Sequence, residues 1–171
     1  MALSVDFMPP SPAGRGEDTH VAPSSGGEGS QPSPQEVADA MYARDHAARA
    51  SGIQLVAINR GSATMSMEVR HDMVNGHNIC HGGYMALLCD TAFAYACNSG
   101  NQNTVASGFS IEILAPAALG DTLVAVAVEQ AQRGRQGVYD IKLTNQNGDI
   151  IALFRGKSAR IAGEVISTQP M

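Results

Sequence analysis

One carboxylate stands alone in a long apolar stretch and is the first candidate for chemistry. Asp90 is the only charged residue between His81 and Asn98, and no residue after Gly83 in this stretch breaks a helix. A helix that is apolar on nearly every face is buried on most sides. Because burying an unpaired carboxylate is costly, we expect Asp90 to be paired, to have a raised pKa, or to face a polar cleft.

A glycine pair, Gly82-Gly83, begins the same predicted helix. Backbone N–H groups at a helix start lack partners and carry partial positive charge, and glycine lets a substrate carbonyl approach closely. A thioester oxygen placed there would be polarised, which lowers a barrier by about 3 kcal/mol per donor. Asp90 lies roughly 12 Å further along the helix. Two subunits could bring the groups together; the alternative is a plain helix start, with Asp90 paired to a core arginine.

The loop before the helix contains His71, His77, Cys80 and His81. Their spacing does not match a zinc site, so we predict no metal. His81 can hydrogen-bond a substrate or fix the loop, and Asn75-Gly76 reads as a turn by itself. Several basic residues near strand ends are either surface charge or contacts to a phosphate: Arg133, Arg135, Arg155 and Lys157.

The patterning predicts a helix over residues 36–50, strands over 53–58 and 63–69, and the apolar helix up to residue 98. Four strands follow, over residues 105–114, 122–130, 138–145 and 150–161. In the first of these, strict alternation would place Val105, Ser107, Phe109, Ile111 and Ile113 on one face. The long helix is too apolar to lie on an open sheet with its other side in water, and an antiparallel meander follows it. This combination indicates an α+β hotdog arrangement, in which the sheet curls around the helix.

Composition bounds the rest of the chain. Residues 1–34 contain 17 Pro, Ser and Gly and are predicted to be a disordered tail, residues 35–163 to be the folded domain, and residues 164–171 to be a short C-terminal tail. The net charge of −5 and the lack of a basic stripe argue against nucleic acid. Three cysteines make no disulfide framework, and neither a secretory signal nor a membrane-spanning run is visible, so the cytoplasm is expected.

Five segments together resemble one family. The runs 75–83 and 88–99, with the later blocks 120–123, 137–141 and 152–158, resemble the phenylacetate-degradation (PaaI-type) thioesterases of the hotdog acyl-CoA thioesterase superfamily. The resemblance covers residues 37–163. It implies a hotdog fold, edge-to-edge dimers that form a homotetramer, no cofactor, and hydrolysis of an acyl-CoA thioester of the hydroxyphenylacetyl type.

The resemblance also assigns roles. Asp90 matches the catalytic carboxylate, as general base or nucleophile, and Gly82 matches the N–H that polarises the carbonyl. Asn75 and His81 match positions that orient water and the thioester. The resemblance also implies that Thr91 and the Ser107 region line the cleft, with Ala106 competing for the position of Ser107, and that Lys157 and the Arg133–Arg135 turn contact the CoA phosphates. The predicted substrate-binding residues are Gly83, Thr91, Ser107, Arg133 and Lys157.

Three other functions compete with this prediction. A hotdog protein could bind acyl-CoA without cleaving it, although intact Asp90 and Gly82 argue against that reading. A hotdog dehydratase would use a histidine with an acidic partner, whereas His81 precedes the helix and no second acid lies in the motif. A metalloprotein built on the 71–81 loop is the third alternative.

Overall fold

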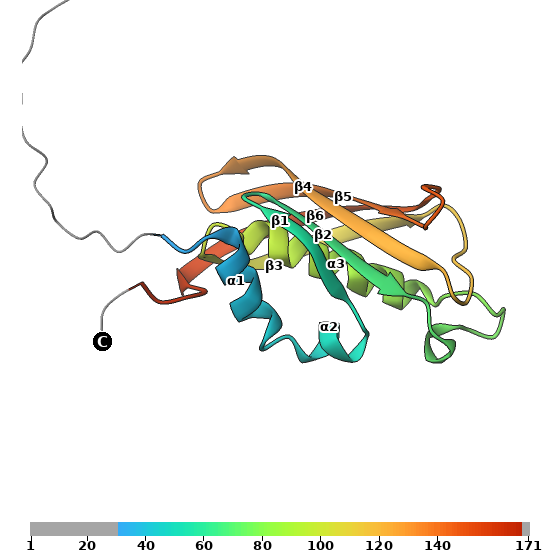
Figure 1. Ribbon diagram of the computed structural model, residues 1–171. Coiled ribbons are helices and arrows are strands. Elements are labelled where there is room, and N and C mark those ends of the chain that lie inside the picture. Colours follow the sequence, from blue (N-terminus) through green and yellow to red (C-terminus); the bar gives the residue numbers. More distant parts are fainter. Residues whose placement is uncertain (1–30, 169–171) are drawn as a thin grey trace, which may run out of the picture.

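The computed structural model describes residues 31–168 and contains one sheet and one long helix (Figure 1). Its elements follow the chain as α1 (Pro34–Tyr42), α2 (His46–Ala50), β1 (Gln54–Asn59), β2 (Ser62–Glu68), a 3-10 turn η1 (His71–Met73), α3 (Gly82–Asn98), β3 (Gln102–Ile113), β4 (Thr122–Arg133), β5 (Gln136–Thr144) and β6 (Ile150–Glu164). The predicted 1–34 tail lies almost wholly outside the described residues.

The six strands form one antiparallel sheet in the order β1-β2-β4-β5-β6-β3. Helix α3 lies along one face of this curved sheet and contacts all six strands (Figure 1). The edges of the sheet are β1 and β3. The predicted α+β hotdog fold is therefore confirmed, because the burial demand of an apolar helix is met by a sheet that wraps around it.

Aromatic packing fixes the depth of α3 on the sheet. The Phe93 ring is buried and lies 5.4 Å from the ring of Tyr139 and 6.2 Å from that of Phe154. A Cβ added to Gly156 would stand 2.9 Å from the Phe93 ring, so glycine on β6 is what lets the helix approach. This contact fixes the position of α3 along the sheet, three residues after Asp90.

The helix predicted over residues 36–50 is two helices. Ser33 and Glu36 form a capping box at the start of α1, and the Asp45 carboxylate accepts the Ala48 N–H to start α2. The backbone of Asp45 is not helical, with φ −85° and ψ 84°. A side chain that caps a new helix start outcompetes continuation of the first helix, which corrects the prediction of one continuous helix.

Strict alternation along β3 was also wrong. The register to β6 shifts between Ala106 and Gly108, so the bulge inserts a residue and changes which face the following side chains occupy. Ala106 pairs with buried Ser158 before the bulge, and Phe109 pairs with buried Gly156 after it. Phe109, Ile111 and Ile113 therefore share the α3 side of the sheet, while Val105 pairs with Ala159 on the other side.

Strand β6 runs to Glu164, three residues beyond its predicted end. The Asn101 side chain holds the chain just after it, accepting the Ile166 N–H at 2.9 Å and donating to the Ile166 carbonyl at 3.0 Å. The first residues of the predicted C-terminal tail are thereby bonded to the turn that follows α3.

Candidate active site

Asp90 lies on α3, half-buried, and its carboxylate makes no hydrogen bond or ion pair with any other residue between 31 and 168. Burial raises the pKa of the Asp90 carboxyl above its ordinary value. The alternative of an Asp90 paired with a core arginine is therefore wrong for the described part of the chain. An unpaired, partly solvated carboxylate with a raised pKa is suited to accept a proton.

Asp90 belongs to a stripe of α3 that the rest of the chain leaves open. Most of α3 is buried, but residues spaced by three or four positions are half-buried or exposed: Gly83, Ala86, Leu87, Asp90 and Ala94. Such spacing marks one face of a helix. A second protein surface or a ligand can therefore reach Asp90 from this side.

The backbone N–H of Gly82 is the free donor at the start of α3. His81 is the N-cap, and its Nδ1 accepts the Gly83 N–H at 3.2 Å, while its carbonyl accepts the Tyr84 N–H at 2.9 Å. Gly82 N–H has no acceptor among the residues described. The N–H of the predicted site residue Gly83 is thus bonded to His81, which leaves the N–H of Gly82 as the candidate donor.

Gly82 opens onto a cavity of about 460 Å³. Asn75 is the polar side chain in its lining, and the rest of the wall is mostly apolar: Ile79, Cys80, Met85, Ile113, Leu114, Ala115 and Pro116. A Cβ on Gly82 would stand 2.9 Å from Ile113 Cδ1, so the wall closes directly over the glycine. The cavity can hold an apolar group beside a free backbone donor.

The side chain of Asn75 shapes the loop in front of this cavity. Its oxygen accepts the His77 N–H at 2.9 Å, and its backbone N–H donates to the Ile79 carbonyl at 2.9 Å. Its NH₂ group has no acceptor in the described residues and can donate to a water or a substrate oxygen. The sequence turn Asn75-Gly76 is thus both a turn and a polar element of the cavity.

Asp90 is absent from the lining of the Gly82 cavity. Eight residues separate the two along α3, a helical distance of roughly 12 Å. One chain therefore does not assemble both groups around one carbonyl, in agreement with their spacing along the helix.

Two further predicted residues have hydroxyl groups already used within the chain. Thr91 is buried, and its Oγ1 donates to the Leu87 carbonyl at 2.8 Å. Ser107 is exposed in the β3 bulge and donates to the Lys157 carbonyl at 3.1 Å. Its competitor Ala106 lies on the α3 side of the sheet, opposite Ser158.

The predicted phosphate contacts are exposed and far from Gly82. Lys157 lies on β6 opposite Gly108, and Arg133 ends β4 beside the Gly134 turn. Neither forms an ion pair with a described residue. They lie toward the C-terminal end of α3, whereas the Gly82 cavity lies at its N-terminal end.

A thiol nucleophile beside Asp90 is not available. Burial, with a smaller contribution from Asp90, raises the pKa of Cys89 to about 12. Burial likewise raises the pKa of Cys97 to about 12. Both thiols are therefore protonated near neutral pH, and thiolate is the reactive form.

The apolar wall of the Gly82 cavity was not predicted from the sequence. Met85, Ile113 and Leu114 read as ordinary core and strand residues, because an apolar side chain carries no signal of which cavity it lines. Pro116, which breaks the strand, was the one visible sign that the chain turns there. Among residues 31–168 no three His, Cys, Asp or Glu side chains gather as a metal group, and no helix is long and apolar enough to cross a membrane.

Known proteins share this fold and sequence. Residues 77–152 match the thioesterase superfamily. The chain is 48% identical over 128 residues to the acyl-coenzyme A thioesterase PaaI of Escherichia coli strain K12, covering 75% of this chain and 91% of that one. The solved structure of the E. coli PaaI protein superposes with a TM-score of 0.76 at 47% identity, over 77% of this chain and 95% of that chain.

A structure of smu.793 from Streptococcus mutans UA159 bound to acetyl CoA has a TM-score of 0.63 at 25% identity, over 66% of this chain and 90% of that chain. Together with the fold, the free Gly82 N–H and the unpaired Asp90, these likenesses decide the class. The chain belongs to the thioesterase superfamily. The predictions of a hotdog thioesterase and of a hydrolase acting on thioester bonds are confirmed.

Proposed function

We propose that the protein hydrolyses acyl-CoA thioesters of the aryl-acetyl type, such as ring-hydroxylated phenylacetyl-CoA. The observation that carries the proposal is that one helix contains both an unpaired, half-buried Asp90 and, at its start, a free Gly82 N–H. The relatives support the chemistry, since one is named an acyl-coenzyme A thioesterase and another was solved with acetyl CoA.

The site is completed by a second copy of the chain. Strand β3, Gln102–Ile113, is an edge strand with one unpaired side, and Asp90 lies on the open stripe of α3. Antiparallel pairing of two β3 edges would set two α3 helices side by side in opposite directions. Asp90 of one chain would then lie near Gly82 of the other, and two such dimers would form the expected homotetramer.

The chemistry follows from these positions. The Gly82 N–H donates to the thioester carbonyl oxygen and stabilises the negative charge that develops on it. Asp90 removes a proton from a water molecule while the water oxygen bonds to the carbonyl carbon. The C–S bond then breaks, and CoA takes up that proton and leaves as the thiol. Alternatively, the Asp90 carboxylate itself attacks the carbonyl carbon, the C–S bond breaks and CoA leaves as the thiolate. Water then cleaves the resulting mixed anhydride, which frees the acid and Asp90 and releases the proton that the CoA thiolate takes up. We assign to the Asn75 NH₂ and His81 Nε2 the orientation of the water and the thioester.

The aromatic part of the proposal is supported by the Gly82 cavity. Its wall is apolar apart from Asn75, whose NH₂ is a donor for a polar substituent. For CoA we retain Lys157 and the Arg133–Arg135 turn as phosphate contacts, because all three are exposed cations without an ionic partner in the described residues. Thr91 and the Ala106–Ser107 bulge are kept as parts of the cleft wall. The chain's three cysteines are free, which fits the expected reducing cytoplasm.

The test is free-thiol release from a panel of acyl-CoA substrates by the wild type and Asp90→Ala. The panel holds phenylacetyl-CoA, a hydroxyphenylacetyl-CoA, benzoyl-CoA, and short and long aliphatic CoAs. We expect aryl-selective turnover that is lost in Asp90→Ala. Turnover that survives the substitution would refute the assignment of Asp90. Binding of CoA esters without any turnover would favour a sensor instead.

A further inference from the structure

One methyl group of Ile113 narrows the space beside the Gly82 N–H. Leaving out the chain neighbours of Gly82 and the nearby helix backbone, Ile113 Cδ1 is the one atom of the described residues within 4 Å of a Cβ built on Gly82, at 2.9 Å. The N of a residue lies about 2.5 Å from its Cβ, so this methyl lies at most about 5.4 Å from the Gly82 N. The wall next to the free donor is therefore a single methyl group.

A thioester carbonyl bonded to the Gly82 N–H brings its α-carbon to a similar distance. The carbonyl oxygen would lie about 2.9 Å from the Gly82 N, and the α-carbon, two bonds further, roughly 4 to 5 Å from it. Carbon atoms in contact are about 3.5 to 4 Å apart. An α-carbon that enters the cavity past Ile113 thus has room for hydrogen atoms on that side, whereas a methyl group there competes with Cδ1 for the same space.

The neck between Gly82 and Ile113 is rigid. Ile113 is the last residue of β3 and is paired with β6. The next two backbone N–H groups, those of Leu114 and Ala115, both donate to the Ile151 carbonyl, at 2.8 and 3.2 Å. Isoleucine is branched at Cβ and therefore stiff at χ1. The methyl group cannot retreat without a strained rotamer or a broken backbone hydrogen bond.

The inner end of the cavity is built from more adaptable side chains. Met85 and Cys80 line it while being 2% and 1% exposed, whereas Ile113 and Leu114, 47% and 61% exposed, lie at its mouth. Methionine is unbranched and fills irregular spaces. The cavity therefore tolerates variation at the far end of an acyl group and restricts the carbon next to the carbonyl.

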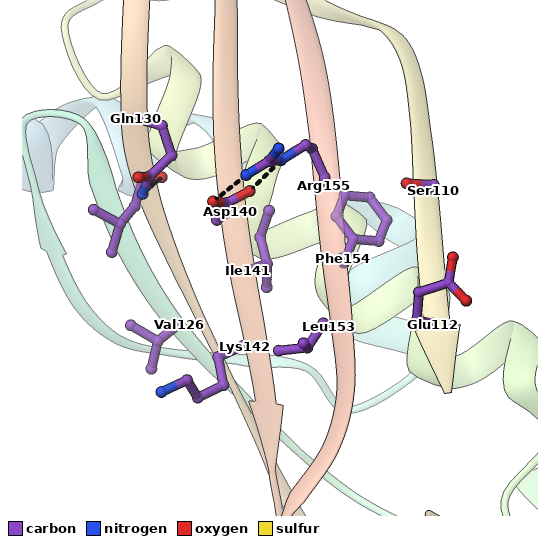
Figure 2. Close-up of a pocket in the computed structure, with 11 residues that line it drawn as sticks. Ser110, Glu112, Val126, Gln130, Asp140, Ile141, Lys142, Leu153, Phe154 and Arg155 are labelled. Atoms are coloured by element: carbon purple, nitrogen blue, oxygen red, sulfur yellow. Dashed lines mark hydrogen bonds and ion pairs between the residues drawn. The ribbon is translucent and has the colours of Figure 1, made fainter. Parts of the chain in front are cut away.

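A larger hollow, of about 600 Å³, lies across β4, β5, β6 and β3 and shares no lining residue with the Gly82 cavity (Figure 2). Glu112 lines this hollow and Ile113 lines the cavity, as expected for strand neighbours whose side chains point to opposite faces. In the hollow, Arg155 donates to Asp140 at 2.6 and 2.7 Å, so these two charges are already paired (Figure 2). The choice of acyl group is therefore assigned to the Gly82 cavity.

We propose that Ile113 is a specificity-determining residue, which favours acyl groups with an unbranched CH₂ next to the carbonyl and disfavours those with a substituent on that carbon. The inference rests on the proposed function, because it takes the Gly82 N–H as the donor to the thioester carbonyl. Aryl-acetyl and straight aliphatic esters have such a CH₂. An α-methyl ester lacks it, and so does a benzoyl ester, whose ring is attached directly to the carbonyl.

The test compares free-thiol release from phenylacetyl-CoA, the two separate enantiomers of 2-phenylpropanoyl-CoA, and 4-methylphenylacetyl-CoA. The wild type should prefer phenylacetyl-CoA over the poorer enantiomer by about 10- to 200-fold in kcat/KM, the usual value of one carbon in an apolar pocket. It should accept the 4-methyl ester, whose extra carbon lies at the far end. The change in preference between two proteins does not depend on the intrinsic reactivity of the esters.

Ile113→Val removes the Cδ1 methyl alone and should lower this preference by about tenfold or more. Ile161→Val is the matched control, because it removes the same methyl from an isoleucine of β6 that is 42% exposed and does not line the cavity. The control should keep the preference of the wild type. Circular dichroism of each variant checks folding.

The outcomes separate this inference from the proposed function. An unchanged preference in folded Ile113→Val, or equal discrimination against the 4-methyl and α-methyl esters, overturns the role of Ile113. If the wild type favours aliphatic esters, butanoyl-CoA and 2-methylbutanoyl-CoA give the same comparison, and a preference that falls in Ile113→Val supports the inference while the aryl part of the proposed function fails.

If no ester is cleaved, the Kd of the same esters is measured by calorimetry. Weaker binding of the α-methyl ester that is relieved in Ile113→Val supports the inference and removes the proposed function. Equal Kd values for the two esters overturn both.

Discussion

At the scale of single residues, the site depends on what is left unpaired. Asp90 has no partner and the Gly82 N–H has no acceptor among the described residues, whereas the N–H beside it, that of Gly83, is bonded to His81. Unsatisfied polar groups cost free energy, so a fold that keeps two of them at one helix has them available for a substrate.

The raised pKa of Asp90 predicts the pH dependence of turnover. A general base must be deprotonated, so kcat/KM should fall as the pH falls through the pKa of Asp90, with the acid limb above the ordinary aspartate value of 3.8. A pH profile of the free-thiol assay measures this. An acid limb at or below the ordinary value would contradict a desolvated Asp90 base.

Asp90→Asn should lose about 10²- to 10⁴-fold in kcat, the usual contribution of a general base, and should raise Tm. The folded pKa of Asp90 is raised, so the carboxyl's favourable contribution to stability exists below the unfolded pKa and is lost as the pH rises through the folded pKa. The gain in Tm of the variant should therefore grow as the pH rises through that interval. Asp39→Asn, an exposed acid on α1, is the control.

Gly82→Ala should lower turnover although it keeps the N–H donor. The added Cβ would stand 2.9 Å from Ile113 Cδ1 and must displace this side chain into the cavity. Combining it with Ile113→Ala should recover part of the loss. Gly76→Ala, in the loop before α3, is a matched control, because a Cβ there has no atom within 4 Å. Kinetics with a short and an aromatic acyl-CoA give the readout.

At the scale of elements, the start of α3 connects stability with the proposed catalysis. His81 caps the helix through Nδ1, and this bond decides which backbone donor remains free. The contact of Phe93 with Gly156 then fixes how deeply α3 lies on the sheet. The position of the Gly82 donor therefore depends on the His81 cap and on the packing of α3 against the sheet, as well as on the glycine itself.

Replacing His81 separates its two roles. His81→Ala should lower the free energy of unfolding by about 1 kcal/mol through loss of the N-cap, and should lower turnover as well. His81→Asn restores a capping side chain, so stability should return. Turnover that stays low in His81→Asn would support contact of His81 with the thioester. Full recovery of turnover would show that His81 acts only as the cap. Urea unfolding and steady-state kinetics give the two readouts.

At the scale of the whole molecule, the proposed chemistry depends on association of two chains. Gly82 and Asp90 of one chain do not share a cavity, while β3 is an edge strand and α3 keeps an open stripe. An exposed edge strand is a template for pairing with another chain. Catalysis is therefore expected only in the dimer or a larger assembly.

Mixing two inactive variants tests the shared site. Asp90→Ala and Gly82→Val are each expected to be inactive, and subunit exchange after mild denaturation should form mixed dimers with one intact site. Random pairing of equal amounts restores about a quarter of the wild-type sites in a twofold dimer. No recovery, with exchange verified by native mass spectrometry, would contradict the two-subunit arrangement.

Much of the fold was readable from the chain. The isolation of Asp90 in an apolar helix, the glycine pair and the hairpin turn at Gly61, whose φ is +73°, follow from local preferences and hydrophobicity. The break at Asp45 and the bulge at Ala106–Gly108 were missed, because a local cap and a shift in the hydrogen-bond ladder leave no mark on periodicity.

The sequence by itself therefore determined the chemistry available: one carboxylate, a helix start with free donors, and a family pattern that names the reaction class. The tertiary structure alone decided that His81 occupies the Gly83 N–H, that Ile113 closes over Gly82, and that Asp90 stays on an open stripe. The physical reason is that residue type sets what a group can do, while strand register and helix packing, which join residues far apart in the chain, set what each group can reach.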